Sequence, residues 1–222
     1  MKKLLPLILF LLIISTVQGQ QIGLQAGQVF SEMRFEDSNG RELENLQSTN
    51  HFFMSGEYRT SLFSEGLNDK MKGSIGIGFY GYGATGSDPV LDNFFEWDLA
   101  YLAINLGLDY EVYQVGRFAA LASIRISPEF MVRGSQTINS QVFDVRGEED
   151  FEGPIIFFRG GLATQFEVTP EATIYAQYLI GQSYSLNSNP GELNLIAQNF
   201  GIGIFLNLQS GNQPSRKRPK SK

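Results

Sequence analysis

Apolar and polar residues alternate along most of this chain. In the stretch DLAYLAINLGLDYEV, residues 98–112, every even position from 100 to 112 is apolar, whereas the odd positions from 101 to 111 are small or polar. Successive side chains of a β-strand point to opposite faces, so the pattern predicts one long strand with an apolar face and a polar face.

The same alternation recurs in seven further segments, two of them weaker than the others. These segments are 71–84, 118–127, 156–168, 173–180 and 199–208, with 21–30 and 52–62 as the weaker pair. The sequence therefore predicts an all-β protein of eight antiparallel strands.

The connections between these strands alternate in length. Long polar stretches follow the first, third, fifth and seventh strands, at 36–50, 85–96, 132–154 and 185–192, and short ones lie at 64–70, 114–116 and 169–171. This order predicts an up-and-down meander with long and short loops at opposite ends. In transmembrane barrels the short turns face the periplasm and the long loops face outside.

The position of the charged residues indicates which face is buried. Eight of them fall on or in line with the polar, glycine-rich face, and we expect these to form a charge network in the lumen: Glu57, Arg59, Asp109, Glu111, Arg125, Glu129, Arg159 and Glu167. A closed barrel is the β-structure that lipid permits, and an eight-stranded lumen is narrow enough for side chains to fill. We therefore predict an eight-stranded antiparallel transmembrane β-barrel in which Arg159 lies close to Glu129. A soluble, secreted lipocalin-like ligand-binding barrel, with apolar residues inside, is the alternative.

Aromatic residues on the apolar face fit two membrane interfaces. Phe158 and Phe166 are eight residues apart, which corresponds to ~20 Å along the axis of a tilted barrel. We expect Tyr110 and Phe118 to join the girdle at the short turns, and Phe130 and Tyr184 to join the outer one.

The two ends of the chain differ from the rest. Residues 1–20 contain two lysines, an apolar run and small residues before Gln20, as in a cleaved secretory signal peptide. Residues 209–222 form a basic tail without apolar periodicity, which we expect to be disordered and periplasmic. Without these ends, 10 of the 17 basic residues remain against 23 acidic ones, which argues against a nucleic-acid partner. The barrel domain is thus expected at 21–208.

These features together resemble the small outer-membrane β-barrel proteins of the OmpA-like and PorT-like porin family. The last strand, NFGIGIFLNL, also resembles the assembly signal that the barrel-insertion machinery reads, carried here by Asn199, Gly201, Ile204 and Leu206. The chain differs from the usual family ending, a terminal aromatic residue, by continuing through the basic tail. The resemblance implies an outer-membrane location, contact with membrane lipid and lipopolysaccharide, and no catalytic residues.

The candidate chemistry is sparse. The single histidine, His51, is expected to share the inward face with Ser55 and Glu57, away from a lipid substrate, so we do not expect the alternative function of a lipid A-modifying enzyme. An acidic stretch lacks the spacing of a calcium loop, although it holds Asp144, Glu148, Glu149, Asp150 and Glu152. We expect no cofactor and no metal site.

The sequence thus predicts an exported, non-enzymatic outer-membrane barrel with a plugged polar lumen. Its role would be envelope structure, surface interaction, or an accessory part of a secretion or transport assembly. An unidentified protein partner would bind through the outer loops or the basic tail.

Overall fold

A computed structural model describes residues 20–36, 46–62, 70–88, 93–148, 151, 153–185 and 192–208. The expected signal peptide, apart from its last residue Gln20, and the basic tail lie outside these residues. Nine β-strands are present: β1 (Gln21–Glu36), β2 (Gln47–Ser61), β3 (Met71–Asp88), β4 (Asn93–Val115), β5 (Phe118–Ile138), β6 (Gln141–Asp144), β7 (Ile155–Thr169), β8 (Ala172–Ser185) and β9 (Glu192–Asn207). Within the described ranges, no helix has the length and apolar character needed to cross a membrane.

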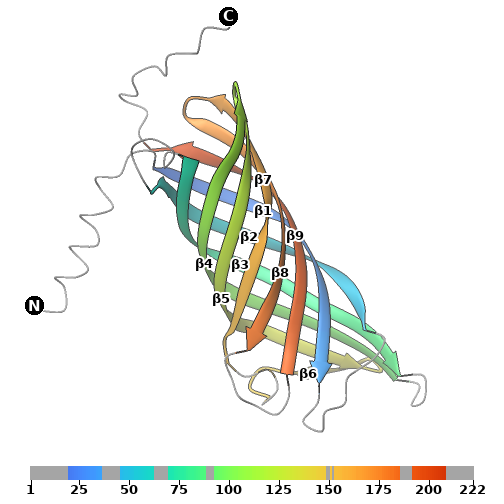
Figure 1. The fold of residues 1–222 in the computed structure, drawn as a ribbon. Coiled ribbons are helices and arrows are strands. Elements are labelled where there is room, and N and C mark those ends of the chain that lie inside the picture. Colours follow the sequence, from blue (N-terminus) through green and yellow to red (C-terminus); the bar gives the residue numbers. More distant parts are fainter. Residues whose placement is uncertain are drawn as a thin grey trace, which may run out of the picture.

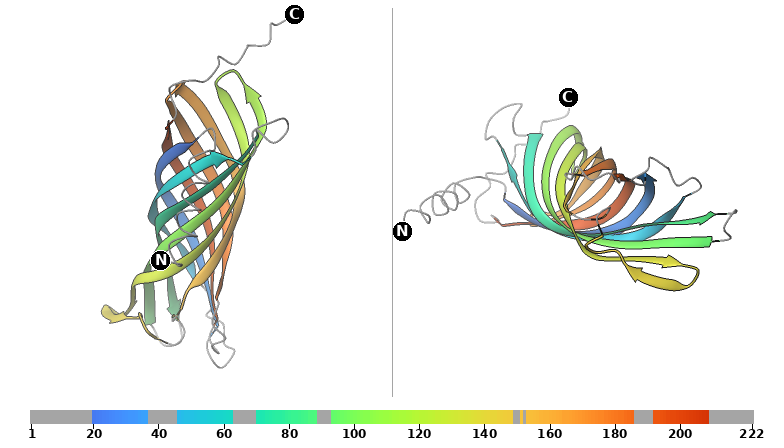
Figure 2. Two further views of the ribbon diagram at one scale, coloured as in Figure 1. Left: turned by 90° about the vertical axis from the view of Figure 1, so that its left-hand side faces the viewer. Right: turned by 90° about the horizontal axis from the view of Figure 1, so that it is seen from below.

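Eight of these strands close into an antiparallel barrel (Figure 1). Each strand of the ring pairs with the next strand in the chain, except that β5 pairs with β7. The short β6 between them in sequence is not part of the ring. The pairing of β1 with β9, from Gln21↔Asn207 to Glu36↔Glu192, closes the ring that Figure 2 shows from below. The predicted eight-stranded closed antiparallel barrel is confirmed.

The ninth strand, β6, extends the barrel at the end opposite to the short turns. It pairs with the last four residues of β5, and Asn139 and Ser140 form the two-residue turn between them with φ of 48° and 72°. Two positive φ values are typical of the turn that matches the twist of a hairpin. This β5–β6 hairpin projects from the ring in Figure 2.

The strands at this end are longer than the alternation predicts. The expected loop 85–96 is mostly strand, because β3 continues to Asp88 and β4 begins at Asn93. Much of the expected loop 132–154 is likewise strand, in the last part of β5 and in β6. Alternation marks a strand only where its two faces meet different surroundings, so the loop bounds from the sequence are wrong here.

The outer wall of the barrel is apolar around its circumference. Ile104 is 46% exposed, whereas its neighbour Asn105 is 6% exposed and lies inside. The six aromatic residues that the sequence assigns to the girdles are also on the outer surface: Tyr110, Phe118, Phe130, Phe158, Phe166 and Tyr184. A soluble protein rarely exposes so large an apolar surface, so the wall is built for hydrocarbon and the lipocalin-like alternative is excluded.

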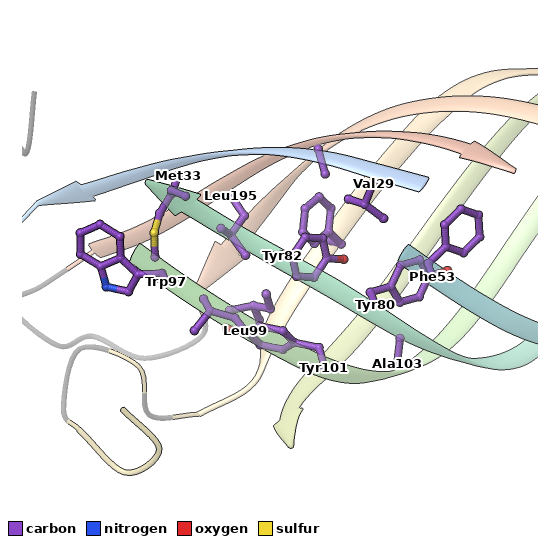
Figure 3. Packing of buried hydrophobic residues seen from close by; sticks show 14 of the residues in the cluster. Val29, Met33, Phe53, Tyr80, Tyr82, Trp97, Leu99, Tyr101, Ala103 and Leu195 are labelled. Carbon is purple, nitrogen blue, oxygen red and sulfur yellow. The ribbon is translucent and has the colours of Figure 1, made fainter. Parts of the chain in front are cut away.

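Aromatic and aliphatic side chains fill the half of the lumen nearest the loops (Figure 3). Phe53 stacks on Tyr80 with ring centroids 5.4 Å apart, and Tyr82 stacks on Phe157 at the same distance. Trp97 and Leu99 on β4 pack into this cluster from the adjoining strand. We call this group the aromatic cluster.

Candidate functional site

Two charged clusters and a smaller apolar group of Leu121, Ala163, Tyr175 and Phe205 occupy the remaining lumen, and the first charged cluster is centred on Asp109 of β4. Arg125 of β5 donates two hydrogen bonds to its carboxylate, 2.7 Å to Oδ1 and 3.2 Å to Oδ2, and Ser123 donates a third of 2.7 Å. Arg59 of β2 approaches from across the lumen, with Nη1 3.5 Å from Asp109 Oδ2. These four residues, the Asp109 cluster, are all buried. One carboxylate thus holds two guanidinium groups and ties β2, β4 and β5 together.

Aromatic rings and small residues make room for these arginines. The Arg59 guanidinium carbon lies 3.7 Å from the centroid of the Phe205 ring, and its Nε donates to Gln21 Oε1 over 2.9 Å. A Cβ placed on Gly107 would lie 2.8 Å from Arg125 Nε, so the absence of a side chain at this position admits the long arginine. The glycine-rich face of the strands therefore reflects the volume of the side chains opposite.

The second cluster lies beneath the aromatic cluster. Arg159 Nη2 is 2.7 Å from Glu129 Oε1, as the sequence leads us to expect, and Tyr82 donates its hydroxyl proton to Glu129 Oε2 over 2.8 Å. Arg159 also donates to Ser127 Oγ over 3.0 Å, and its guanidinium carbon lies 3.9 Å from the Phe157 ring centroid. We call Tyr82, Ser127, Glu129 and Arg159 the Glu129 cluster. Its residues are buried, and it links β3, β5 and β7.

Glu57 completes the charge balance between the two clusters. The three buried carboxylates of Glu57, Asp109 and Glu129 equal in number the three buried guanidinium groups of Arg59, Arg125 and Arg159. Glu57 Oε1 has no hydrogen-bond partner within the described residues and borders a cavity of about 10 Å³. Such a volume holds about one water molecule, so the lumen is filled by side chains.

Two residues expected in the network lie elsewhere. Glu111 is partly exposed and precedes an irregularity in the β4–β5 register, and Glu167 is exposed near the end of β7. Neither makes an ion pair with another described residue. The lumen network of the structure therefore comprises six of the eight expected residues.

The residues of the expected assembly signal all lie on β9. Asn199 and Gly201 are buried on the inner face, whereas Ile204 and Leu206 are exposed on the outer wall. This strand closes the barrel against β1, and Leu208 N donates to Gln20 O at the same edge. Recognition of these residues by an insertion machinery stays a prediction.

On β2, His51 falls on the same side of the strand as Ser55 and Glu57, opposite the exposed Phe52, and it pairs with the buried Val29 of β1. The β2–β3 register shifts between Ser48 and Phe53, and a Cβ placed on Gly83 would lie 2.5 Å from His51 Nε2. Because Tyr82 points inward, this side of Gly83 is the outer one. The bulge in β2 thus carries the imidazole over the outer face of β3.

Polar neighbours of His51 lie on this outer side. Thr49 Oγ1 is 2.9 Å from His51 Nε2, and Asp98 Oδ1 is 3.9 Å from Nδ1. Asp98 is bound more closely by Arg133, over 2.6 Å. The imidazole side chain is 21% exposed, so most of its surface is covered by the adjoining strands.

The acidic stretch after β5 gives no metal centre among the residues that the structure describes. Hydrogen bonds from the Arg146 guanidinium lower the pKa of Asp144 to about 2. Glu149, Asp150 and Glu152 lie outside the described residues, and Glu148 is exposed.

Comparisons with known proteins give no family for this chain. No protein-family description matches it, and no curated protein matches it in sequence. Among solved structures, neisserial surface protein A (NspA) aligns at 13% identity over 84% of this chain and 96% of its own, with a TM-score of 0.49. OprG from Pseudomonas aeruginosa aligns at 12% identity over 86% of this chain and 97% of its own, with a TM-score of 0.45. The outer membrane protease OmpT from Escherichia coli aligns at 9% identity over 86% and 97%, with a TM-score of 0.42.

Proposed function

We propose that this chain is a non-enzymatic outer-membrane protein whose sealed barrel supports envelope structure and surface interaction. The observation that carries the proposal is the combination of an apolar outer wall with a lumen filled by side chains. Spanning the hydrocarbon region explains the wall, and the neutral set of six buried charges explains how the lumen stays closed without a bound ion. The proposal includes the role that the resemblance to the OmpA-like and PorT-like family suggests. In that role the barrel would be an accessory part of a secretion or transport assembly.

The partners follow from the surfaces. Membrane lipid and lipopolysaccharide would cover the apolar wall, and the barrel-insertion machinery would read β9 during assembly. An unidentified protein would bind at the end where the β5–β6 hairpin projects, or through the basic tail at the other end. The export signal at residues 1–20 and an outer-membrane location complete this proposal.

The orientation of the wall can be tested at two adjacent residues. Ile104→Cys and Asn105→Cys, each carrying an environment-sensitive fluorophore, are reconstituted with lipids that bear a quencher at the middle of the bilayer. The chain has no native cysteine, so each label is unique. We expect quenching of the label at residue 104 and none at residue 105, and the reverse pattern would contradict the membrane assignment.

Conductance tests the sealed lumen. Pure protein in planar bilayers should pass little or no steady current, because the two charged clusters and the aromatic cluster occupy the interior. Large and reproducible single-channel steps would contradict this part of the proposal. Outer-membrane fractionation of the expressing cells tests the location separately.

A lipid-modifying enzyme is the second candidate, favoured by the outer position of His51 beside Thr49 and Asp98. A hydroxyl, an imidazole and a carboxylate in this order are the elements of nucleophilic catalysis. The separation of 3.9 Å between His51 and Asp98 and the cover over the imidazole argue against it. Release of fatty acid from outer-leaflet lipid by the pure protein, abolished by His51→Ala, would establish the enzyme and overturn the non-enzymatic proposal.

A further inference from the structure

The barrel wall contains a break between β5 and β7. Their pairing ends at Glu129↔Ile155, and β6 takes up the same edge of β5 only from Ser135 onwards. Residues 130–134 of β5 therefore have no strand beside them on this edge. The backbone hydrogen bond from Val145 N to Gly134 O, 3.2 Å long, continues the β5–β6 pairing by one residue and does not reach β7.

A cavity of about 220 Å³ lies at this break. Phe130, Met131, Phe151 and Pro154 supply its apolar lining, together with two glycines and Arg146. The glycines, at positions 147 and 153, have φ of 82° and 94°, which a residue with a side chain rarely adopts. The chain thus turns sharply on either side of Phe151 and brings this ring against the wall. We call this cavity the β5–β7 notch.

The notch connects two different surroundings. Phe130 is 46% exposed on the outer wall, in the aromatic girdle near the loops. Met131 and Phe151 pack instead against the aromatic cluster of the lumen. The notch therefore lies within the thickness of the wall, with one side toward lipid and the other against the apolar half of the lumen.

The charge at its rim does not select an ion. Arg146 Nη2 is 2.6 Å from Asp144 Oδ2, and the low pKa of Asp144 keeps this pair ionised at neutral pH. The pair is neutral as a whole, and every other side chain of the lining is apolar. The notch is open to the outside, and an apolar surface of this kind gains free energy when hydrocarbon rather than water covers it. The lining thus fits hydrocarbon.

We propose that the β5–β7 notch binds one hydrocarbon chain of an outer-leaflet lipid, held between Phe130 and Phe151. The lipid is the occupant because Phe130 opens the notch onto the surface that hydrocarbon covers. A bound chain would replace the missing strand contacts of β5 with apolar contacts and would seal the break. The proposal goes beyond the sealed-barrel function and rests only on the spanning of the membrane.

Photochemical labelling of the unmodified protein tests the proposal directly. The full chain is reconstituted with phosphatidylcholine that carries a diazirine on one acyl chain, irradiated, and mapped by mass spectrometry. We expect the yield of adducts on Met131 and Phe151 to be several-fold higher than the yield on Phe157. Phe157 lies in the lumen on β7 and does not line the notch. Adducts on Met131 and Phe151 no more frequent than on Phe157 would overturn the proposal.

Blocking the notch provides the matched control. The thiol of Phe130→Cys is converted with hexyl methanethiosulfonate to a mixed disulfide, with release of methanesulfinate, so that a tethered hexyl chain fills the notch. Phe158→Cys receives the same group on the same lipid-facing girdle. We expect labelling of Phe151 to fall several-fold in the first protein and to stay unchanged in the second. An equal effect of the two modifications would overturn the proposal, and so would labelling of Phe151 by a free diazirine alkane but not by the lipid. Loss of the membrane assignment itself would show separately, as absence of lipid adducts on Ile104.

Discussion

The two halves of the lumen are filled by different chemistry. Near the short turns, the Asp109 cluster holds two guanidinium groups on one carboxylate, 2.7 Å and 3.5 Å away, and only one ring pair, Tyr175 with Phe205, packs beside them among the described residues. Toward the loops, stacked rings fill the lumen, and a single ion pair between Arg159 and Glu129 lies beneath them. An ion pair requires each charged group to lie beside one particular partner, whereas the packing of rings requires only a suitable shape and volume. The half built on charge should therefore tolerate substitution less than the half built on rings.

The largest expected effect tests the Asp109 cluster. Asp109→Ala removes the one carboxylate that two buried arginines share, and breaking a buried pair by removing one partner costs ~3–5 kcal/mol. Unfolding by guanidinium chloride in lipid vesicles measures the loss of unfolding free energy. Asp144→Ala is the control, because this carboxylate pairs with Arg146 where both side chains are 55% exposed, and it should leave the unfolding free energy nearly unchanged. Equal behaviour of the two variants would contradict the role of burial.

A smaller effect is expected where the two halves meet. Tyr82→Phe removes a hydroxyl that donates to Glu129 and accepts from Arg159. Hydrogen bonds to charged groups contribute ~1.5–3 kcal/mol, so the same unfolding measurement should lose about that amount. Tyr101→Phe, in which the removed hydroxyl makes neither of these bonds, should cost clearly less. A Tyr101→Phe loss as large as that of Tyr82→Phe would mean that volume alone decides stability in this region.

The smallest effect is expected for a change of shape within the aromatic cluster. Phe157→Leu keeps an apolar side chain but loses the stacking on Tyr82, and an aromatic pair contributes ~0.5–1.5 kcal/mol beyond its buried area. Phe158→Leu, at the next position on the lipid-facing wall, is the matched control and should cost less in the same unfolding assay. A larger loss for Phe158→Leu would reverse the assignment of inner and outer faces on β7.

Much of the architecture follows from alternation, because lipid and lumen impose opposite demands on the two faces of each strand. Ile104 and Asn105 lie on the faces that their chemistry predicts, and the contact between Arg159 and Glu129 follows from strand order. The aromatic cluster was missed because Tyr80, Tyr82 and Tyr101 fall on the face that glycines and charges mark as polar. A lumen that changes from charged to aromatic along its length has no signature in a pattern of period two.

Local departures from regular pairing explain the remaining errors. One irregularity in the β2–β3 pairing places His51 over the outer side of Gly83, and another in the β4–β5 pairing follows Glu111 near the turn. A bulge shifts the register between two strands, so alternation along one strand no longer tells which part of the neighbouring strand a side chain meets. The break between β5 and β7 lies in a segment that the sequence marks only as a long loop, so the notch could not be anticipated.

The distribution of the six buried charges over the strands also constrains the order in which the barrel can assemble. Glu57 and Arg59 lie on β2, Asp109 on β4, and the other three on β5 and β7. If a sheet entered hydrocarbon with β4 and β5 but without β2, the pair of Arg125 and Asp109 would be in the membrane. Glu57 and Arg59 on β2 would not yet have entered it. A partly inserted sheet also exposes unpaired backbone at its edges, which lipid does not tolerate. The full set of charge partners is therefore present only when β2, β4, β5 and β7 are together, and the backbone edges of β1 and β9 are satisfied only when these two strands pair.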